Sequence, residues 1–387
     1  MKRIIRVLLI CLIVITQKAQ EAICTVSVAN LMGDHPDIHK PCQDLLNGPA
    51  SQIKRINQLI FNERVTILEE RYGAYRIFVP DHGYGTHKNK IIHHEYWVAS
   101  NAITPLDELQ DTQAIPPKSS NNKTITLTKP FNDRTYHRLY SLGTRFVIDS
   151  TQNKDNSIRV LLITPKLKTG HIYIPKDHTV HTDNLNIQEK IDLFIKILED
   201  VAEQSNSYVP YVWGGNSFVK IYKNGSVTLV KATGTCTAQP PAKNIPNSGF
   251  DCASLIHRVA QTAGIPLHVK NSSGIKNVLK PLALGESVEN GDLIYIPGHI
   301  ITLVDTNTGM CVEARTQSHG YGYVQHISLA ELFKEILNSN TLMRYHHTKK
   351  PASRLDSTGE IIRTVPITIL KIRSAFEMTN ESAPGRS

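Results

Sequence analysis

The residue with the clearest capacity for covalent chemistry in the 387-residue sequence is Cys252. It follows Asp251, a residue type favoured at helix N-caps, and apolar residues recur after it at helical spacing. We therefore expect a helix that begins at residue 251 or 252. A cysteine in the first helical turn lies at the positive end of the helix dipole, which lowers the pKa of the thiol and favours the nucleophilic thiolate. A buried, unreactive thiol is the alternative interpretation of this segment.

His299 is the candidate base for this thiol. A predicted strand over residues 292–296 ends in Pro297-Gly298, and His299 then opens the next apolar run, residues 300–304. An imidazole next to a thiol can accept its proton and so activate the sulfur. A histidine with a purely structural role, in the core or on the surface, is the competing interpretation.

Glu313 is the candidate third catalytic residue. It lies among apolar strand residues, across a predicted turn at 307–309 from the His299 strand. A carboxylate that accepts a hydrogen bond from the second ring nitrogen would fix the imidazole tautomer and stabilise the imidazolium. His319 and His326 are alternatives for this role.

The elements around these residues predict an α+β protein with several domains. Short alternating strands separated by Gly and Pro occupy two regions, and a helix followed by antiparallel strands characterises a third. A polar, Pro- and Ser-rich stretch between the two β regions is expected to be a linker. The expected boundaries are a signal peptide at 1–22, all-β domains at 26–107 and 123–183, a catalytic domain at 187–348 and a polar tail at 349–387, which contains a strand-like run at 361–372.

Four motifs occur in order within residues 208–336: Tyr211-Val212-Trp213-Gly214-Gly215, Gly249-Phe250-Asp251-Cys252, Gly291-Asp292-Leu293 and Gly298-His299. Together they resemble the NlpC-type cysteine peptidases. The resemblance implies a papain-like α+β catalytic domain with Cys252 as nucleophile and His299 as base. The third polar residue of that family is commonly a histidine, and Glu313 takes its position here. Tyr211 matches the family's tyrosine beside the nucleophile, whose hydroxyl helps to shape the oxyanion site; plain packing is its alternative role.

The two upstream regions resemble bacterial SH3-like domains. The expected fold is therefore a papain-like NlpC-type catalytic domain preceded by two small all-β SH3-like barrels. This architecture resembles the γ-D-glutamyl-L-diamino acid endopeptidases of peptidoglycan turnover, in which the first module walls the cleft and a free N-terminal L-alanine is preferred. The resemblance implies that Asp251 binds the substrate amine. Its role as a helix cap is a competing explanation, and both can hold.

The expected activity is hydrolysis of γ-D-glutamyl-diamino acid bonds in peptidoglycan-derived peptides, the muropeptides, with no cofactor and no metal. One alternative is an N-acetylmuramoyl-L-alanine amidase or another acyl-transfer enzyme on this fold. The other is a catalytically inactive wall-binding protein. The adjacent pairs His93-His94 and His346-His347 lack the spacing of metal ligands.

Residues 1–22 have the organisation of a secretory signal peptide, with Lys2, Arg3 and Arg6 ahead of an apolar run at 7–15. That run is too short to span a bilayer comfortably. We therefore expect an exported protein, periplasmic or secreted, with no stable membrane insertion after cleavage. The net charge of +9 favours anionic partners, and the lack of a Lys/Arg block with interleaved aromatic residues argues against nucleic acid.

Five cysteines follow the predicted signal peptide: Cys24, Cys42, Cys236, Cys252 and Cys311. In an exported protein an odd number indicates a free thiol, and two disulfides plus one reactive thiol would account for all five. The alternative is that several of them are buried and reduced. A long insertion at 217–248, upstream of the nucleophile, is a candidate lid over the cleft.

Overall fold

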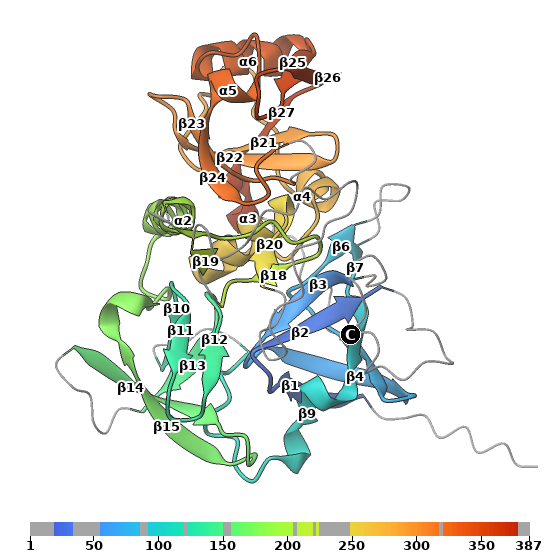
Figure 1. The fold of residues 1–387 in the computed structure, drawn as a ribbon, viewed down its shortest axis with the longest axis vertical. Coiled ribbons are helices and arrows are strands. Elements are labelled where there is room, and N and C mark those ends of the chain that lie inside the picture. The colour runs from blue at the N-terminus through green and yellow to red at the C-terminus, as the bar shows by residue number, and fades with distance from the viewer. Residues whose placement is uncertain are drawn as a thin grey trace, which may run out of the picture.

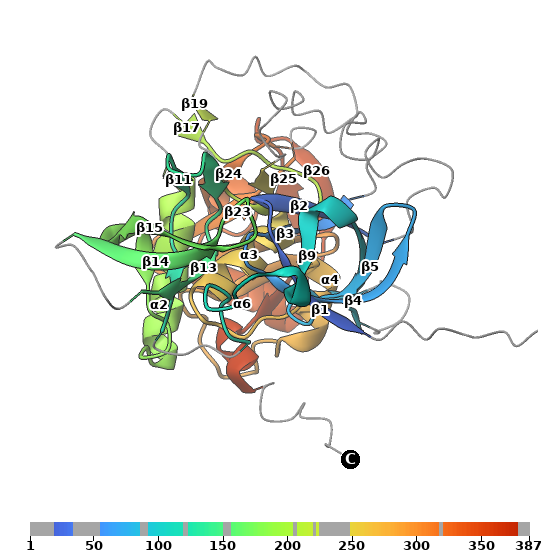
Figure 2. The ribbon, with the colours of Figure 1, turned by 90° about the horizontal axis from the view of Figure 1, so that it is seen from below.

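A computed structural model describes residues 19–33, 55–85, 92–118, 123–149, 156–203, 207–219, 222–223, 248–316 and 320–377. Within these ranges the chain forms two all-β units that lie below a third unit of mixed helices and strands (Figure 1). Seen from below, the two β units lie side by side beneath the third (Figure 2). The mixture of helices and antiparallel sheets agrees with the α+β class predicted from the sequence. No helix in the described ranges is both long and apolar enough to cross a bilayer.

The first unit is a seven-stranded antiparallel sheet with the order β3-β2-β8-β5-β4-β1-β9. Its strands alternate as the sequence predicts: Val65 and Ile67 are buried, whereas Arg64 and Thr66 are only partly buried. A short hairpin, β6–β7, accompanies the sheet. The strands are β1 (Gln20–Cys24), β2 (Val28–Met32), β3 (Arg55–Ile60), β4 (Arg64–Arg71), β5 (Ala74–Phe78), β6 (Tyr84–Gly85), β7 (Ile92–His93), β8 (Glu95–Ala99) and β9 (Ile103–Pro105).

Strand β1 crosses the boundary expected at residue 22. Gln20 pairs with Ile67, Ala22 is fully buried in the core of this sheet, and Ile23 is fully buried in the core of the second unit. Because these residues contribute backbone pairing and apolar burial, the folded unit begins by residue 20. The predicted charged start and apolar run, residues 1–15, lie outside the described residues.

The second unit is a five-stranded antiparallel sheet with the order β15-β14-β13-β10-β16, next to a separate hairpin, β11–β12. Its core also takes in Ile23 and Phe61 of the first unit, and the rings of Phe61 and Tyr140 lie 5.1 Å apart. Ala114 and Ile115, in the stretch expected to be a linker, are buried in the same core. The strands are β10 (Thr124–Leu127), β11 (Phe131–Asp133), β12 (Arg138–Tyr140), β13 (Arg145–Ile148), β14 (Ser157–Ile163), β15 (Thr169–Pro175) and β16 (Thr179–Val180).

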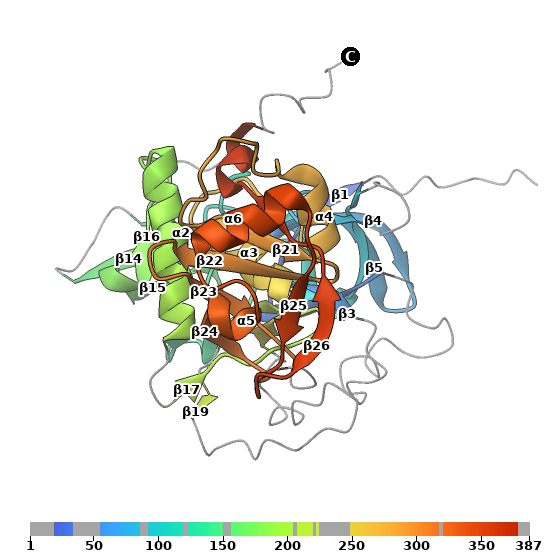
Figure 3. The ribbon, with the colours of Figure 1, turned by 90° about the horizontal axis from the view of Figure 1, so that it is seen from above.

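The third unit has a central antiparallel sheet with the order β24-β23-β22-β21-β27. Both faces of this sheet are covered, since Leu293 belongs to the core beneath α2 and α3, and its neighbour Ile294 to the core beneath α5 and α6. Helix α6 and the hairpin β25–β26 cover the sheet when it is seen from above (Figure 3). The helices are α2 (Ile187–Ala202), α3 (Cys252–Thr262), α4 (Ser272–Val278), α5 (Leu329–Leu332) and α6 (Ser339–Thr348). The strands are β17 (Ser207–Tyr208), β18 (Asn216–Ser217), β19 (Tyr222–Lys223), β20 (Gly249–Phe250), β21 (Leu293–Ile296), β22 (His299–Asp305), β23 (Met310–Ala314), β24 (Val324–Ser328), β25 (Ala352–Leu355), β26 (Ile361–Val365) and β27 (Thr368–Leu370).

The segment expected to be a polar tail, 349–387, is largely part of the third unit. Strand β27 adds to the central sheet beside β21, and β25 and β26 form a hairpin against its covered face. The strand-like run expected at 361–372 corresponds to β26 and β27. The expectation of a tail outside the fold was wrong for residues 351–377, because the charged and polar residues there alternate with buried ones such as Ala352 and Ile369. Residues 378–387 lie outside the described residues.

Candidate active site

Helix α3 begins at Cys252, as the sequence predicts, and Asp251 is its N-cap. The Asp251 carboxylate accepts hydrogen bonds from the backbone N–H groups of Ala253 and Ser254, and the Asp251 N–H in turn donates one to the Ser254 hydroxyl oxygen. Gly249 leads into this turn with a positive φ of 156°, and a Cβ there would lie 2.4 Å from the Pro210 carbonyl oxygen. Only glycine fits this approach, so the motif positions the thiol through its backbone.

The other oxygen of Asp251 is also occupied. Its Oδ2 accepts hydrogen bonds from the Gly214 backbone at 3.1 Å and from the Lys270 ammonium at 2.6 Å. Lys270 is 3% exposed and donates a second hydrogen bond, at 2.6 Å, to the Ile56 carbonyl in β3 of the first unit. The carboxylate expected to bind a substrate amine is therefore already paired with an ammonium group of the protein. Sequence inspection missed Lys270, because nothing in its neighbourhood marks it as a partner of Asp251.

His299 opens β22, and Glu313 lies on the adjacent strand β23, where the pairing of Thr302 with Val312 sets the register. His299 Nε2 lies 2.7 Å from Glu313 Oε2, within hydrogen-bonding distance. The predicted contact between these two side chains thus exists. It arises from the hairpin turn that the sequence places between the two strands.

Glu313 is held as an anion by two arginines. It is 1% exposed, and its Oε2 accepts a hydrogen bond at 2.6 Å from Arg354, while Arg315 Nη1 lies 3.7 Å from Oε1. Burial acts to raise the pKa of Glu313, but Arg354 and His299 outweigh it and lower the pKa to about 2. Arg354 comes from β25, in the segment expected to be a tail, and was missed for that reason.

The thiol of Cys252 lies beside the start of β22. The backbone of Ile300, the residue after His299, forms a hydrogen bond with the sulfur, and α3 packs against β22 in the shared core. The helix start, the histidine and the glutamate thus come from three elements that meet at one end of the sheet.

The charge state of the thiol differs from the sequence expectation. Burial, together with the neighbouring Asp251 carboxylate, raises the pKa of Cys252 to about 12. The favourable helix dipole is outweighed, since an anion at this position loses water and faces a carboxylate. Burial also lowers the pKa of His299, although the bond to Glu313 opposes that shift. At neutral pH the structure therefore favours the neutral thiol of Cys252 and the neutral imidazole of His299.

Tyr211 lies next to the nucleophile turn. Its backbone forms a parallel bridge with Phe250, and its side chain packs partly buried against the core that also contacts Cys252. Trp213, two residues on, is 62% exposed, and its carbonyl oxygen accepts two hydrogen bonds from Arg55 of β3. The first unit therefore fixes the loop that carries Tyr211.

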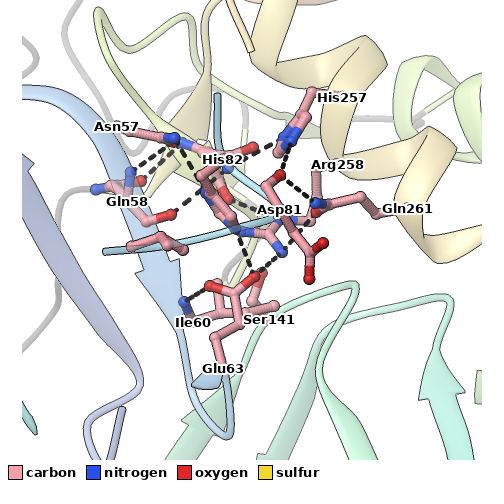
Figure 4. Close-up of polar contacts among 12 residues, drawn as sticks. Asn57, Gln58, Ile60, Glu63, Asp81, His82, Ser141, His257, Arg258 and Gln261 are labelled. Carbon is pink, nitrogen blue, oxygen red and sulfur yellow. Dashed lines mark hydrogen bonds and ion pairs between the residues drawn. The ribbon is translucent and has the colours of Figure 1, made fainter. Parts of the chain in front are cut away.

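The first unit also contacts the side of α3 through buried polar groups (Figure 4). Glu63 Oε1 accepts a hydrogen bond from Arg258 at 2.5 Å and lies 3.0 Å from His82 Nε2. Burial acts to raise the pKa of Glu63, but Arg258 and His82 hold it well below its usual range. In the same interface Gln58 accepts a hydrogen bond at 2.8 Å from the Ser217 hydroxyl. These contacts position α3, which begins at Cys252, relative to the first unit.

The remaining histidine and cysteine candidates that the structure describes do not take part in the contact between His299 and Glu313. His326 lies on β24, opposite Val312, and His319 lies outside the described residues. Cys24 and Cys311 are both buried and free, so the arrangement with two disulfides is wrong for these two residues. Burial raises the pKa of each of these two thiols. Cys42, Cys236 and most of the 217–248 insertion lie outside the described residues.

No family model and no curated protein matches this sequence. Among solved structures, an NlpC/P60 family protein from Bacillus cereus aligns with a TM-score of 0.51 and 18% identity, over 80% of this chain and 94% of that chain. The chain shares the fold of that protein. The NlpC-type fold expected from the four motifs is thereby supported in three dimensions.

Two other solved structures are less similar. An NlpC/P60 endopeptidase from Photobacterium damselae subsp. piscicida aligns with a TM-score of 0.40 and 9% identity, over 91% of this chain and 73% of that chain. The peptidoglycan hydrolase RipB from Mycobacterium tuberculosis aligns with a TM-score of 0.25 and 20% identity, over 51% of this chain and 68% of that chain.

Proposed function

We propose that this protein is a cysteine endopeptidase that hydrolyses γ-D-glutamyl-diamino acid bonds in peptidoglycan-derived peptides. The observation that carries the proposal is the meeting of the Cys252 thiol, at a helix start, with the first residues of β22, where His299 is bonded to Glu313. The fold shared with an NlpC/P60 family protein supports the same class of chemistry. The assignment of the two β units as SH3-like domains, and the exact bond, are parts of this proposal.

The ionisation of Glu313 decides which nitrogen of His299 acts as the base. An ionised carboxylate can only accept, so His299 Nε2 carries the proton and donates it to Glu313. Nδ1 is then the unprotonated nitrogen. In the proposed reaction Nδ1 takes the thiol proton as the Cys252 sulfur attacks the substrate carbonyl, and then gives it to the departing amine. Water, deprotonated by the same nitrogen, releases the acid product and restores the thiol.

The negative charge that develops on the carbonyl oxygen needs donors near the sulfur. The first N–H groups of a helix have no partner within the helix, and the Asp251 side chain satisfies those of Ala253 and Ser254. We assign the Cys252 N–H to the oxyanion, assisted by the Tyr211 hydroxyl. No metal or cofactor takes part in this scheme.

The experiment that tests the proposed bond uses purified muropeptides and mass spectrometry of the products. Cleavage after D-glutamate would release peptides that begin with the diamino acid. An amidase would instead separate the intact peptide from the sugar, and an inactive wall-binding protein would leave the masses unchanged. Either of these two outcomes contradicts the proposal.

The exchange of Glu313 for glutamine is expected to move the acid limb of the kcat/KM profile to lower pH. Glu313 raises the pKa of His299, whereas Arg354 and Arg315 lower it, so loss of the carboxylate makes the imidazole harder to protonate. The value of kcat is expected to fall about 10²-fold, because the imidazolium loses its counter-charge. Rates measured on one muropeptide between pH 4 and 8 test this. The exposed Glu360, changed to glutamine, is the control, and an acid limb that moves upward would contradict the prediction.

Acetylation of the substrate's N-terminal amine is expected to change kcat/KM by less than about tenfold. Asp251 already accepts four hydrogen bonds and pairs with Lys270, so an incoming amine would meet a neutralised carboxylate. The measurement compares one muropeptide with a free N-terminal L-alanine and the same compound after N-acetylation. A loss of 100-fold or more on acetylation would show that Asp251 binds the amine after all.

The proposed substrate lies outside the cytoplasm, and the charged start and apolar run predicted over residues 1–15 agree with that location. We therefore include export to the periplasm or medium in the proposal, with muropeptides as the partner.

A further inference from the structure

A cavity of about 520 Å³ lies where the three units meet. Its walls include Thr66 of β4, Gly143 and Arg145 of the second unit, and Arg258 and Gln261 of α3. Its volume is within the range of small-molecule sites, about 300–1,000 Å³. None of Cys252, His299 or Glu313 lines it, so it is separate from the candidate active site.

The carboxylates in this cavity already have partners. Glu21 forms an ion pair with Arg64 at 3.4 Å and a second with Lys118. Glu63 pairs with Arg258 at 2.5 Å, as Figure 4 shows. The Asp81 carboxylate lies 3.2 Å from His268 Nδ1. These three acidic side chains therefore leave little negative charge for another cation.

Arg145 differs from the other cations of the cavity, because no carboxylate of the described residues lies within 4.0 Å of its guanidinium. Its Nη2 donates a long hydrogen bond, of 3.5 Å, to the Thr124 hydroxyl. Its backbone is anchored, since Asn62 donates a hydrogen bond at 2.9 Å to the Arg145 carbonyl oxygen. Asp81 and Asp183 act on it only at longer range, and burial lowers its pKa.

A partly buried arginine that has no adjacent anion in the protein can pair with the negative charge of a bound ligand. The guanidinium presents a planar set of donors that fits the two oxygens of a carboxylate or phosphate. The neighbouring Pro80 and Pro116 supply apolar wall on either side. The close approach of the second unit to α3 also depends on Gly143, where a Cβ would meet Arg258 at 2.7 Å.

We propose that this junction cavity is a second binding site, for a small oxyanion whose carboxylate or phosphate group pairs with Arg145. The site goes beyond the proposed peptidase activity and does not depend on it. Because Arg258 and Gln261 belong to α3, the ligand would contact the same helix that begins at Cys252.

Calorimetric titration of the full chain with glutarate and, separately, with inorganic phosphate tests the proposal. Potassium chloride at matched ionic strength controls for screening. We expect saturable binding of at least one of the two anions. Whether glutarate or phosphate binds then shows whether the site takes a carboxylate or a phosphate group. Arg145→Gln should weaken that binding at least about tenfold, since a charge-assisted hydrogen bond is lost. The exposed Arg344, changed to glutamine, is the matched control and should bind as the wild type does.

A second variant, Thr66→Trp, fills the cavity without removing a charge and should also weaken binding. Circular dichroism shows whether each variant is folded, so that loss of binding is not confused with unfolding. The proposal is overturned if neither anion binds more strongly than chloride does. It is equally overturned if folded Arg145→Gln and Thr66→Trp variants both bind like the wild type. Loss of peptidase activity plays no part in this test, so the two proposals can fail independently.

Discussion

Cys252→Ala is expected to lower the rate of muropeptide hydrolysis by about 10⁴-fold or more, the largest effect of any single change in the chain. The sulfur is the only proposed nucleophile, and no neighbouring group is placed to take over its bond to the carbonyl carbon. The fold should persist, because the change removes one partly buried atom at a helix start that Asp251 still caps. The measurement is the initial rate of release of diamino-acid peptides, quantified by mass spectrometry.

Cys311→Ala provides the matched control. Cys311 is a free, fully buried thiol on β23, so its removal should leave kcat within about threefold of the wild-type value. If Cys252→Ala retained a tenth or more of the wild-type rate, the reaction would have to proceed without the thiol. The assignment as a cysteine peptidase would then be wrong.

Arg354→Met is expected to cost about 3–5 kcal/mol of the free energy of unfolding. The change leaves Glu313, which is 1% exposed, without its closest cation, and Arg315 at 3.7 Å cannot replace a hydrogen bond of 2.6 Å. A buried carboxylate that has lost its partner bears the full penalty of its desolvation. Urea unfolding, followed by circular dichroism, gives the midpoint from which the loss is calculated.

Two further variants separate charge pairing from packing. Arg363 lies opposite Arg354 in the hairpin and is exposed, and it donates one hydrogen bond of 2.9 Å to the Pro297 carbonyl oxygen, so Arg363→Met should change the stability by no more than about 1 kcal/mol. Addition of Glu313→Gln to Arg354→Met removes the unpaired charge and should recover part of the loss. Equal stability of Arg354→Met and the wild type would mean that the ion pair contributes nothing to the fold.

The local parts of the site were predictable. Asp251 as a helix cap, Cys252 at the first turn, and a strand that opens at His299 all follow from patterns within a few residues of one another. The contact between His299 and Glu313 needed only a hairpin whose turn is visible in the sequence. The four motifs then gave these local patterns a common interpretation, and the shared fold agrees with it.

Several of the expectations that failed concern groups that meet across long separations. Strand β25 with its Arg354 was assigned to a polar tail, because a short strand that contains charged and polar residues does not differ from an exposed segment until its partners are known. The stretch expected to be a linker likewise buries Ala114 and Ile115 in a core made by other segments.

The sequence by itself determined which residues stand at the start of α3 and at the start of β22, since helix capping and strand alternation act between near neighbours. Only the tertiary structure decided the electrostatic state of those residues. The pKa of Cys252 rises and that of Glu313 falls because burial and the charges of Asp251 and Arg354 act through space. Lys270 reaches Asp251 in the same way. Coulombic and desolvation energies depend on distance and exposure, which residue spacing along the chain does not specify.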